Sequence, residues 1–156
     1  MQKRQRCLGI DYGQARIGLA ISDETKMIAR GLDNLIHPKN LEKAANALLD
    51  RIHDLEKEEL FIDEIVIGLP KHLDGREGTL GPEIEKFVAL LKEKQTRPVH
   101  FWEERLSSAQ AERLMRDSGV KRKKRAENVD RLSAIIILQS YLDQKGMMPN
   151  IPPMQS

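Results

Sequence analysis

The chain has 156 residues, of which 40% are hydrophobic and 32% are charged, and its formal net charge at pH 7 is +2. These proportions are typical of one globular domain and exclude a disordered chain. No apolar run approaches the roughly 20 residues of a membrane span, and the single cysteine, Cys7, which we expect to be buried, excludes an internal disulfide. Because the N-terminal residues also lack the apolar region of a secretory signal, we expect a cytoplasmic protein.

Three strands are expected at the start of the chain, over residues 5–12, 15–22 and 27–36. The first two are apolar and are joined at Gly13, which can take the positive φ of a tight turn, so the three predict an antiparallel meander. One carboxylate, Asp11, interrupts the first strand. Because burial of a lone carboxylate is costly, we expect a cation, a proton or hydrogen bonds to compensate Asp11.

Helices and apolar strands alternate after the meander. Asn40 can cap a helix whose apolar residues recur at the i, i+3, i+4 spacing of an amphipathic helix. The continuous apolar run at 65–69 predicts a strand that is buried on both faces in a parallel arrangement. A helix then begins at Pro82, and residues 97–102 form a further candidate for a parallel strand.

Two more helices are expected near the C-terminus. Ser107 and Gln110 form a capping-box pattern that starts a helix ending near Asp117. Asn128 or a neighbour would cap the last helix, over roughly residues 129–143, and the apolar run inside it indicates deep packing.

The elements come in the order of three strands, a helix, a strand, a helix, a strand and two helices. This order predicts an α/β fold with a five-stranded mixed sheet, in which two parallel strands extend the antiparallel meander and helices cover both faces. The first strand would lie at the centre, beside the strand at 65–69. We expect a single domain over residues 1–145 and a flexible C-terminal tail over residues 146–156.

Acidic residues gather where the C-terminal ends of the parallel strands share one edge of the sheet, which is the usual ligand site of open α/β sheets. Asp11 lies late in the first strand, Glu103 and Glu104 follow the last strand, and Asp130 lies in the first turn of the last helix. Spacing does not choose between Glu103 and Glu104. Taken alone, Asp130 is better explained as a favourable charge at a helix N-terminus.

Acids at one edge repel each other unless a divalent cation lies between them. Carboxylate oxygens, completed by substrate phosphate, describe a site for one or two Mg²⁺ or Mn²⁺ ions. Two such ions clamp the attacking water and the leaving oxygen in phosphodiester hydrolysis. The acids therefore predict metal-dependent hydrolysis of nucleic acid, and the metal would also keep a buried Asp11 ionised.

Five consecutive cations precede the last helix, namely Lys121, Arg122, Lys123, Lys124 and Arg125. Such a run is either a solvated loop or a basic arm that binds the phosphate backbone, and the run alone does not choose between them. An arm would give an affinity that falls steeply with salt and has little sequence preference.

Four stretches of the chain resemble those of a known family. These stretches are Ile10–Ala20, Val66–Pro70 with Asp74-Gly75, Glu104–Ser107, and Val129-Asp130 with 133–142. Together they resemble the YqgF/RuvX family of bacterial RNase H-like nucleases, which are described as Holliday junction resolvases and as pre-16S rRNA nucleases. The resemblance covers about residues 7–142 and implies an RNase H-like fold.

The resemblance implies that Asp11, Glu104 and Asp130 are the catalytic and metal-binding acids, and so it selects Glu104 where spacing could not. Arg16 and Arg105 become candidate phosphate contacts, although pairing with nearby acids explains them about equally well.

Two positions depart from the pattern of the family. Glu103 stands where the family usually has Asp, and His72 stands where it often has Asn. The second departure lies in the glycine-rich loop at 70–81, to which we assign no ligand contact.

Within this resemblance we expect processing of the pre-16S rRNA 5′ end in ribosome biogenesis. Holliday junction resolution in DNA recombination and repair is one alternative, and a non-catalytic RNA-binding ribosome-maturation factor is another. Sugar kinases and chaperone ATPases share the Asp-x-Gly motif, but 156 residues leave no room for their second lobe. The chain is expected to be a monomer or a homodimer, and a dimer would favour a DNA junction.

Overall fold

The computed structural model describes residues 4–70, 80–104 and 122–147. In chain order the elements are β1 (Gln5–Tyr12), β2 (Arg16–Ser22), β3 (Ala29–Ile36), α1 (Leu41–Lys57), β4 (Phe61–Pro70), α2 (Leu80–Lys94), β5 (Val99–Glu104) and α4 (Arg122–Met147). None of the helices in these ranges is both long enough and apolar enough to cross a membrane. The helix predicted at 107–117 and the tail after residue 147 lie outside the described residues.

The strands form one five-stranded mixed sheet in the order β3-β2-β1-β4-β5, which confirms the predicted topology with β1 at the centre. β1 pairs antiparallel with β2 and parallel with β4, and β5 runs parallel to β4. The register sets Ile10 of β1 opposite Leu19 of β2 and Ile67 of β4. β1 and β4 each pair with a strand on both edges, and helices on the two faces of the sheet bury their apolar runs.

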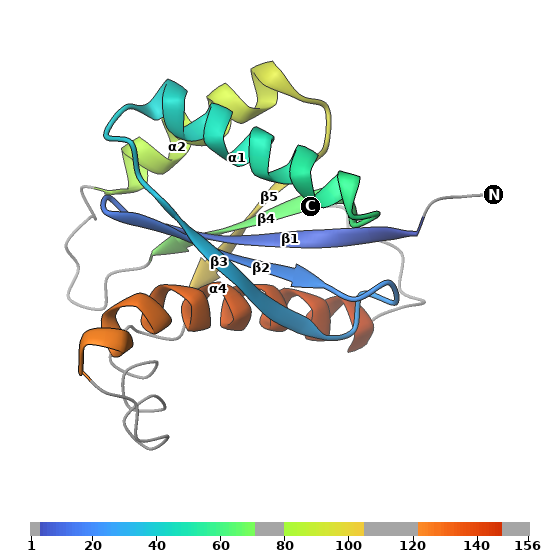
Figure 1. Ribbon diagram of the computed structural model, residues 1–156. Helices are drawn as coiled ribbons and strands as arrows, with labels where there is room; N and C mark the ends of the chain where they lie inside the picture. Colours follow the sequence, from blue (N-terminus) through green and yellow to red (C-terminus); the bar gives the residue numbers. More distant parts are fainter. Residues whose placement is uncertain (1–3, 71–79, 105–121, 148–156) are drawn as a thin grey trace.

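Helices cover both faces of the sheet, with α1 and α2 on one face and α4 on the other (Figure 1). Leu8, Ile10 and Tyr12 of β1 pack with α1 and α2, whereas Cys7 packs with α4. This division follows from the two-residue period of a strand. Cys7 is fully buried, and burial raises the pKa of its thiol, as expected of a small core residue rather than a nucleophile.

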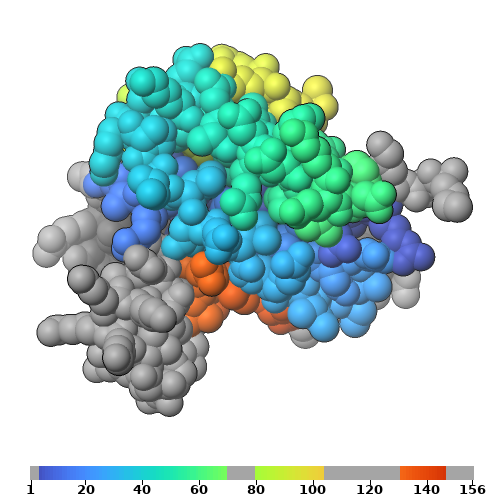
Figure 2. Space-filling model, viewed as in Figure 1, coloured from blue at the N-terminus to red at the C-terminus, as the bar shows by residue number. Residues whose placement is uncertain are grey.

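The helix α1 begins where the sequence predicts. The side-chain oxygen of its N-cap Asn40 accepts the backbone N–H of Lys43 at 2.9 Å, which satisfies one of the donors left open at a helix start. Its apolar residues are buried against the sheet and against α2. Figure 2 shows the edge strand β3 at the surface, with α1 on one side of it and α4 on the other.

The last helix starts earlier than predicted. α4 begins at Arg122, passes through the expected cap Asn128 and continues past Gly146 to Met147. Between Arg122 and Asn128 there is no Gly or Pro and most residues are strong helix formers, so extending the helix is easier than starting a new one at Asn128. Residues 122–125 belong to this helix, so the first of the two alternatives for the basic run, a solvated loop, does not hold for them.

The strand β4 is longer than the strand predicted at 65–69. It begins at Phe61, which pairs with Gln5 of β1, and it includes Asp63 and Glu64. These two charges interrupt the apolar run, so a search for continuous apolar residues does not find the first part of the strand.

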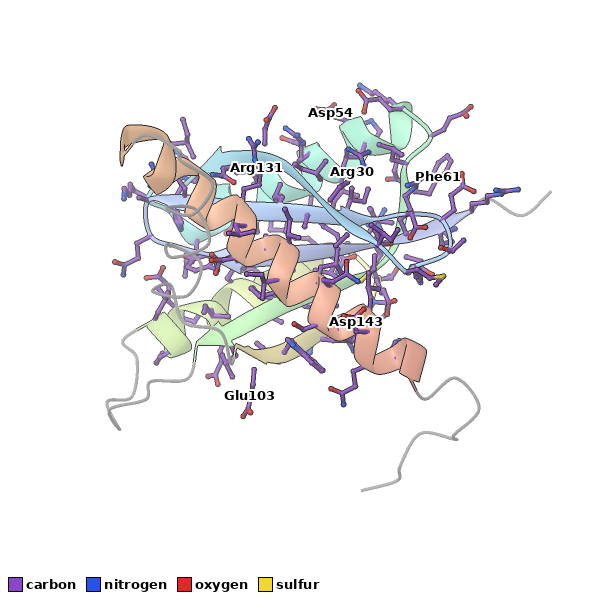
Figure 3. All side chains as sticks on the ribbon, turned by 90° about the horizontal axis from the view of Figure 1, so that it is seen from below. Arg30, Asp54, Phe61, Glu103, Arg131 and Asp143 are labelled. Atoms are coloured by element: carbon purple, nitrogen blue, oxygen red, sulfur yellow. The ribbon has the colours of Figure 1, made fainter. Side chains whose placement is uncertain are left out.

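Two glycines let α4 lie close to the sheet. A Cβ atom at Gly9 of β1 would lie 2.7 Å from Cβ of Leu138, and one at Gly31 of β3 would lie 2.5 Å from Cγ of Arg131. Both separations are shorter than Cβ contacts in real proteins, so a larger residue would push the helix away. Figure 3 shows α4 crossing the sheet diagonally on this face.

Candidate functional site

Asp11 is the next-to-last residue of β1 and pairs with Gly18 of β2. The residues before it, from Cys7 to Ile10, are buried, whereas Asp11 is only partly buried. The expectation of a buried Asp11 is therefore wrong, although Tyr12, which follows it, is buried on the other face of the sheet. Desolvation penalises a charged Asp11 less here than it would at a core position.

Asp11 lies on the face of the sheet that α4 covers. Cys7 packs with residues of α4, and Gly9 lies against Leu138. Because alternate residues of a strand point to the same face, Asp11 is the next member of this series. Tyr12 belongs to the other series and is buried on the face of α1 and α2.

The pleat of β5 separates two adjacent glutamates. Trp102 packs with residues of α4, and Glu104, which ends the strand, occupies the next position of the same series. Glu103 belongs to the opposite series with Phe101 and is exposed at the edge of the sheet (Figure 3). The strand register therefore favours Glu104 on the α4 face, a choice that residue spacing left open.

Asp130 precedes Arg131 on α4, and the contacts of Arg131 show where this part of the helix lies. Nη2 of Arg131 lies 3.1 Å from a carboxylate oxygen of Asp33. The pairing of β3 with β2 is irregular at Asp33, next to Gly18 of β2. Gly18 in turn pairs with Asp11 of β1. The helix next to Asp130 therefore lies over β3, where the stem of Arg131 also approaches Gly31.

The backbone thus places positions 11 and 104 on the α4 face at the C-terminal ends of β1 and β5, and position 130 in the first half of the helix that covers this face. Figure 3 shows Glu103 and Arg131, the chain neighbours of two of these positions, toward the end of the sheet opposite to Phe61, where β4 begins. Within the part of the chain that was described, no three side chains of His, Cys, Asp or Glu form a group that could hold a metal ion. The side chains of Glu104 and Asp130 lie outside that part.

The candidate nucleic-acid contacts lie on two elements near this end. Arg16 begins β2 and is partly exposed, directly after the turn at Gly13. Residues 122–125 form the start of α4, which is the end of the helix that also carries Asp130. The remaining candidates, Arg105 and Lys121, lie outside the described residues.

A hydrogen-bonded cluster that the sequence did not reveal surrounds Tyr12, which follows Asp11 in the chain but faces the other side of the sheet. The Tyr12 hydroxyl lies 2.7 Å from Nε2 of His37 and donates to a carboxylate oxygen of Glu83 at 2.5 Å. Burial, together with the hydrogen bond to Glu83 and its charge, raises the pKa of Tyr12, and burial lowers the pKa of His37. The three residues lie far apart in the chain, so no local spacing indicates the cluster.

A second buried cluster lies toward the opposite end of the sheet. Glu64 is 6% exposed and accepts hydrogen bonds from the Tyr141 hydroxyl at 3.0 Å, from Lys26 at 3.1 Å and from Lys145 at 3.4 Å. Nε2 of His100 lies 3.4 Å away. Burial acts to raise the pKa of Glu64, but the hydrogen bond and charge of Lys26, with Lys145 and Tyr141, outweigh it and lower this pKa. The ionised Glu64 therefore ties β4 to α4.

Known proteins resemble this chain over most of its length. The model of the RuvX family, described as Holliday junction resolvase, matches residues 5–144. A Protochlamydia amoebophila protein named as a pre-16S rRNA nuclease is 48% identical over 144 residues, which cover 92% of this chain and 96% of that protein. A Koribacter versatilis protein of the same name is 42% identical over 142 residues, which cover 91% of this chain and 89% of that protein. The structure of Thermus thermophilus RuvC in complex with a Holliday junction substrate is similar with a TM-score of 0.50 and 16% identity, over 91% of this chain and 96% of that one.

Proposed function

Since this chain belongs to the RuvX family of Holliday junction resolvases, and shares its RNase H-like fold with RuvC, we propose that it hydrolyses phosphodiester bonds of structured nucleic acid. Its catalytic acids are Asp11, Glu104 and Asp130. The observation that carries this proposal is the convergence of the three positions on the α4 face, where β1 and β5 end. This edge is the usual ligand site of a sheet with parallel central strands.

The same acids would hold one or two Mg²⁺ or Mn²⁺ ions. Their oxygens are hard ligands that suit either ion, and the partial exposure of Asp11 fits a ligand that is shared with substrate and water. When bound, the metal supplies Lewis-acid polarisation of the phosphodiester and lowers the pKa of the attacking water. The role of the protein is to hold the acids in place, since rigid strands carry two of them and a long helix carries the third.

Basic residues next to the acids would bind the phosphate backbone. Arg122, Lys123, Lys124 and Arg125 precede Asp130 on one continuous helix, so a backbone bound along them would lead toward the acids. Further candidates are Arg16, which begins the strand after the Asp11 turn, together with Arg105 and Lys121. Such contacts position a nucleic acid without selecting its base sequence.

Precursor 16S rRNA is the first candidate substrate, because the relatives that are 48% and 42% identical are named for it. Four-way DNA junctions are the second, because the description of the matching family model names them. A junction has two strands to cut about a dyad, so resolution would require a homodimer, whereas rRNA processing suits a monomer as well.

A side-by-side cleavage assay on precursor 16S rRNA and four-way junction DNA, with Mn²⁺, tests the proposal. Asp11→Asn should abolish cleavage and leave the fold intact. Asp54→Asn is the matched control, because Asp54 is an exposed aspartate of α1, on the other face of the sheet, where it pairs with Lys57. Full cleavage by Asp11→Asn would refute the site. Binding of RNA without cleavage by the wild type would identify a non-catalytic maturation factor instead.

A further inference from the structure

Tyr12 follows Asp11 in β1 but is buried on the opposite face of the sheet, where it is 3% exposed. Its ring packs against Phe87 of α2 at a centroid distance of 4.9 Å and against the edge of His37 at 5.3 Å. We propose that Tyr12, held between His37 and Glu83, is a positioning residue for Asp11. The inference rests on the proposed role of Asp11 as a metal-binding acid.

The direction of each hydrogen bond in this cluster follows from one backbone contact. The N–H of Lys39 donates to Nδ1 of His37 at 2.9 Å, so this nitrogen is an acceptor and the ring proton of neutral His37 lies on Nε2. Nε2 then donates to the Tyr12 hydroxyl at 2.7 Å, and the hydroxyl donates to Glu83 at 2.5 Å. The Tyr12 oxygen accepts one hydrogen bond and donates one, so it is fixed from two sides.

The segment that carries His37 also holds the turn after Asp11. The backbone N–H of His37 donates to the carbonyl oxygen of Ala15 at 3.0 Å, and Nζ of Lys39 donates to the carbonyl oxygen of Gln14 at 2.7 Å. The chain on the C-terminal side of Asp11 is therefore fixed both at the end of the strand and in the turn.

The cluster acts from behind the sheet. Glu83 lies in the first turn of α2, where a carboxylate is also favoured by the helix N-terminus, so Tyr12 joins the end of β1 to this helix. Because Tyr12 is buried on the face away from α4, its hydroxyl does not face a substrate bound on the α4 side and acts through the strand that Tyr12 shares with Asp11. A residue that supports a metal ligand in this way sets the orientation of the ligand.

Tyr141 offers a matched control for Tyr12. It is 6% exposed, and its hydroxyl also donates to a buried carboxylate, that of Glu64, at 3.0 Å. It lies on α4 toward the end of the sheet opposite to Asp11. Replacement of either tyrosine by phenylalanine removes one hydroxyl and keeps the ring, so a purely structural role predicts the same outcome for both.

The test compares Tyr12→Phe and Tyr141→Phe with the wild type by thermal unfolding, by Mn²⁺ binding followed through the EPR signal of free Mn²⁺, and by kcat and KM for the cleaved nucleic acid. We expect Tyr12→Phe to lower kcat and the Mn²⁺ affinity by about 10- to 100-fold and to leave KM for the nucleic acid unchanged. Tyr141→Phe should lower Tm but leave kcat and the Mn²⁺ affinity unchanged. Equal effects of the two substitutions on kcat and on Mn²⁺ affinity would overturn the inference.

Glu83 provides a second test if Tyr12→Phe does not fold. Glu83→Ala removes the acceptor from a half-buried position and should weaken Mn²⁺ binding, whereas Glu83→Gln keeps an acceptor oxygen and should restore it. If Glu83→Ala keeps the Mn²⁺ affinity of the wild type, the inference about Tyr12 is overturned, but the proposed function is not. The proposed function is refuted, and the inference with it, if two results are found together. The first is that the wild type and Asp11→Asn bind Mn²⁺ alike, and the second is that the wild type does not cleave nucleic acid.

Discussion

Leu138 of α4 lies directly over Gly9 of β1, since a Cβ atom at Gly9 would be 2.7 Å from Cβ of Leu138. This contact sets how far along β1 the helix lies. Asp130 precedes Leu138 by about two turns of the same helix, so this contact also fixes where Asp130 lies relative to β1, which carries Asp11. The glycine thus controls the separation of two candidate metal ligands that are far apart in the sequence.

Gly9→Ala should therefore reduce both stability and activity. The added methyl would push α4 away from β1, and overpacking of this kind typically costs about 1–3 kcal/mol of the free energy of unfolding. Urea unfolding measures the loss, and the cleavage assay measures the activity of the protein that remains folded.

Gly81→Ala is the control for this substitution, because nothing lies within 4 Å of a Cβ atom at Gly81 in α2. Alanine in a helix loses less backbone entropy on folding than glycine, so this control should be neutral or stabilising. Wild-type stability and activity of Gly9→Ala would show that the close contact does not position the helix.

Glu104→Gln and Glu103→Gln should behave differently although the two residues are neighbours. If Glu104 is a metal ligand, its loss removes several kcal/mol of transition-state stabilisation, which is about 100-fold or more in rate. Glu103 belongs to the opposite face of β5 and is exposed, so its replacement should leave the rate close to that of the wild type. Single-turnover cleavage with Mn²⁺ measures both, and a greater loss from Glu103→Gln would contradict the assignment by strand register.

A double substitution, Lys123→Gln with Lys124→Gln, should weaken nucleic-acid binding and make it less sensitive to salt. For every phosphate that the variant no longer binds, the slope of log affinity against log salt concentration should fall by about 0.7–0.9. Fluorescence anisotropy with labelled RNA or junction DNA measures this slope. Lys57→Gln removes a charge from an exposed lysine at the end of α1 and should leave the slope unchanged. The prediction fails if the control and the double variant change the slope alike.

Glu64→Gln should change how stability depends on pH. Burial acts to raise the pKa of Glu64, but Lys26, Lys145 and Tyr141 outweigh it, so the folded-state pKa lies below the ordinary value of 4.5. The folded state then binds fewer protons than the unfolded state, and Glu64 stabilises the fold above pH 4.5. This contribution is lost as the pH falls through the lowered pKa.

We therefore expect Glu64→Gln to be less stable than the wild type at neutral pH, with a difference that shrinks in acid. Urea unfolding of both proteins over a pH series gives the two curves. A difference that stays constant across the series would mean that the charge of Glu64 is not what stabilises this cluster.

Local patterns were sufficient for most of the fold. The alternation of apolar residues and the order of the elements predicted the sheet with β1 at its centre, because handed crossovers leave few ways to connect such strands. The cap at Asn40 was predictable for a similar reason, since the side chain bonds the helix that directly follows it. The start of α4 was not predictable, because helix propensity and charge repulsion within residues 122–125 compete, and local sequence does not settle that competition.

The sequence by itself determined the order of the elements, the resemblance to a nuclease family and the acids that deserve a test. Only the tertiary structure decided that the positions of Asp11, Glu104 and Asp130 share one face, and that Tyr12 meets two partners behind the sheet. The physical reason is the range of the interactions. Periods of two and 3.6 residues act between near neighbours in the chain, whereas the pleat of β5, the fit of α4 onto Gly9 and the buried hydrogen bonds depend on packing between distant segments.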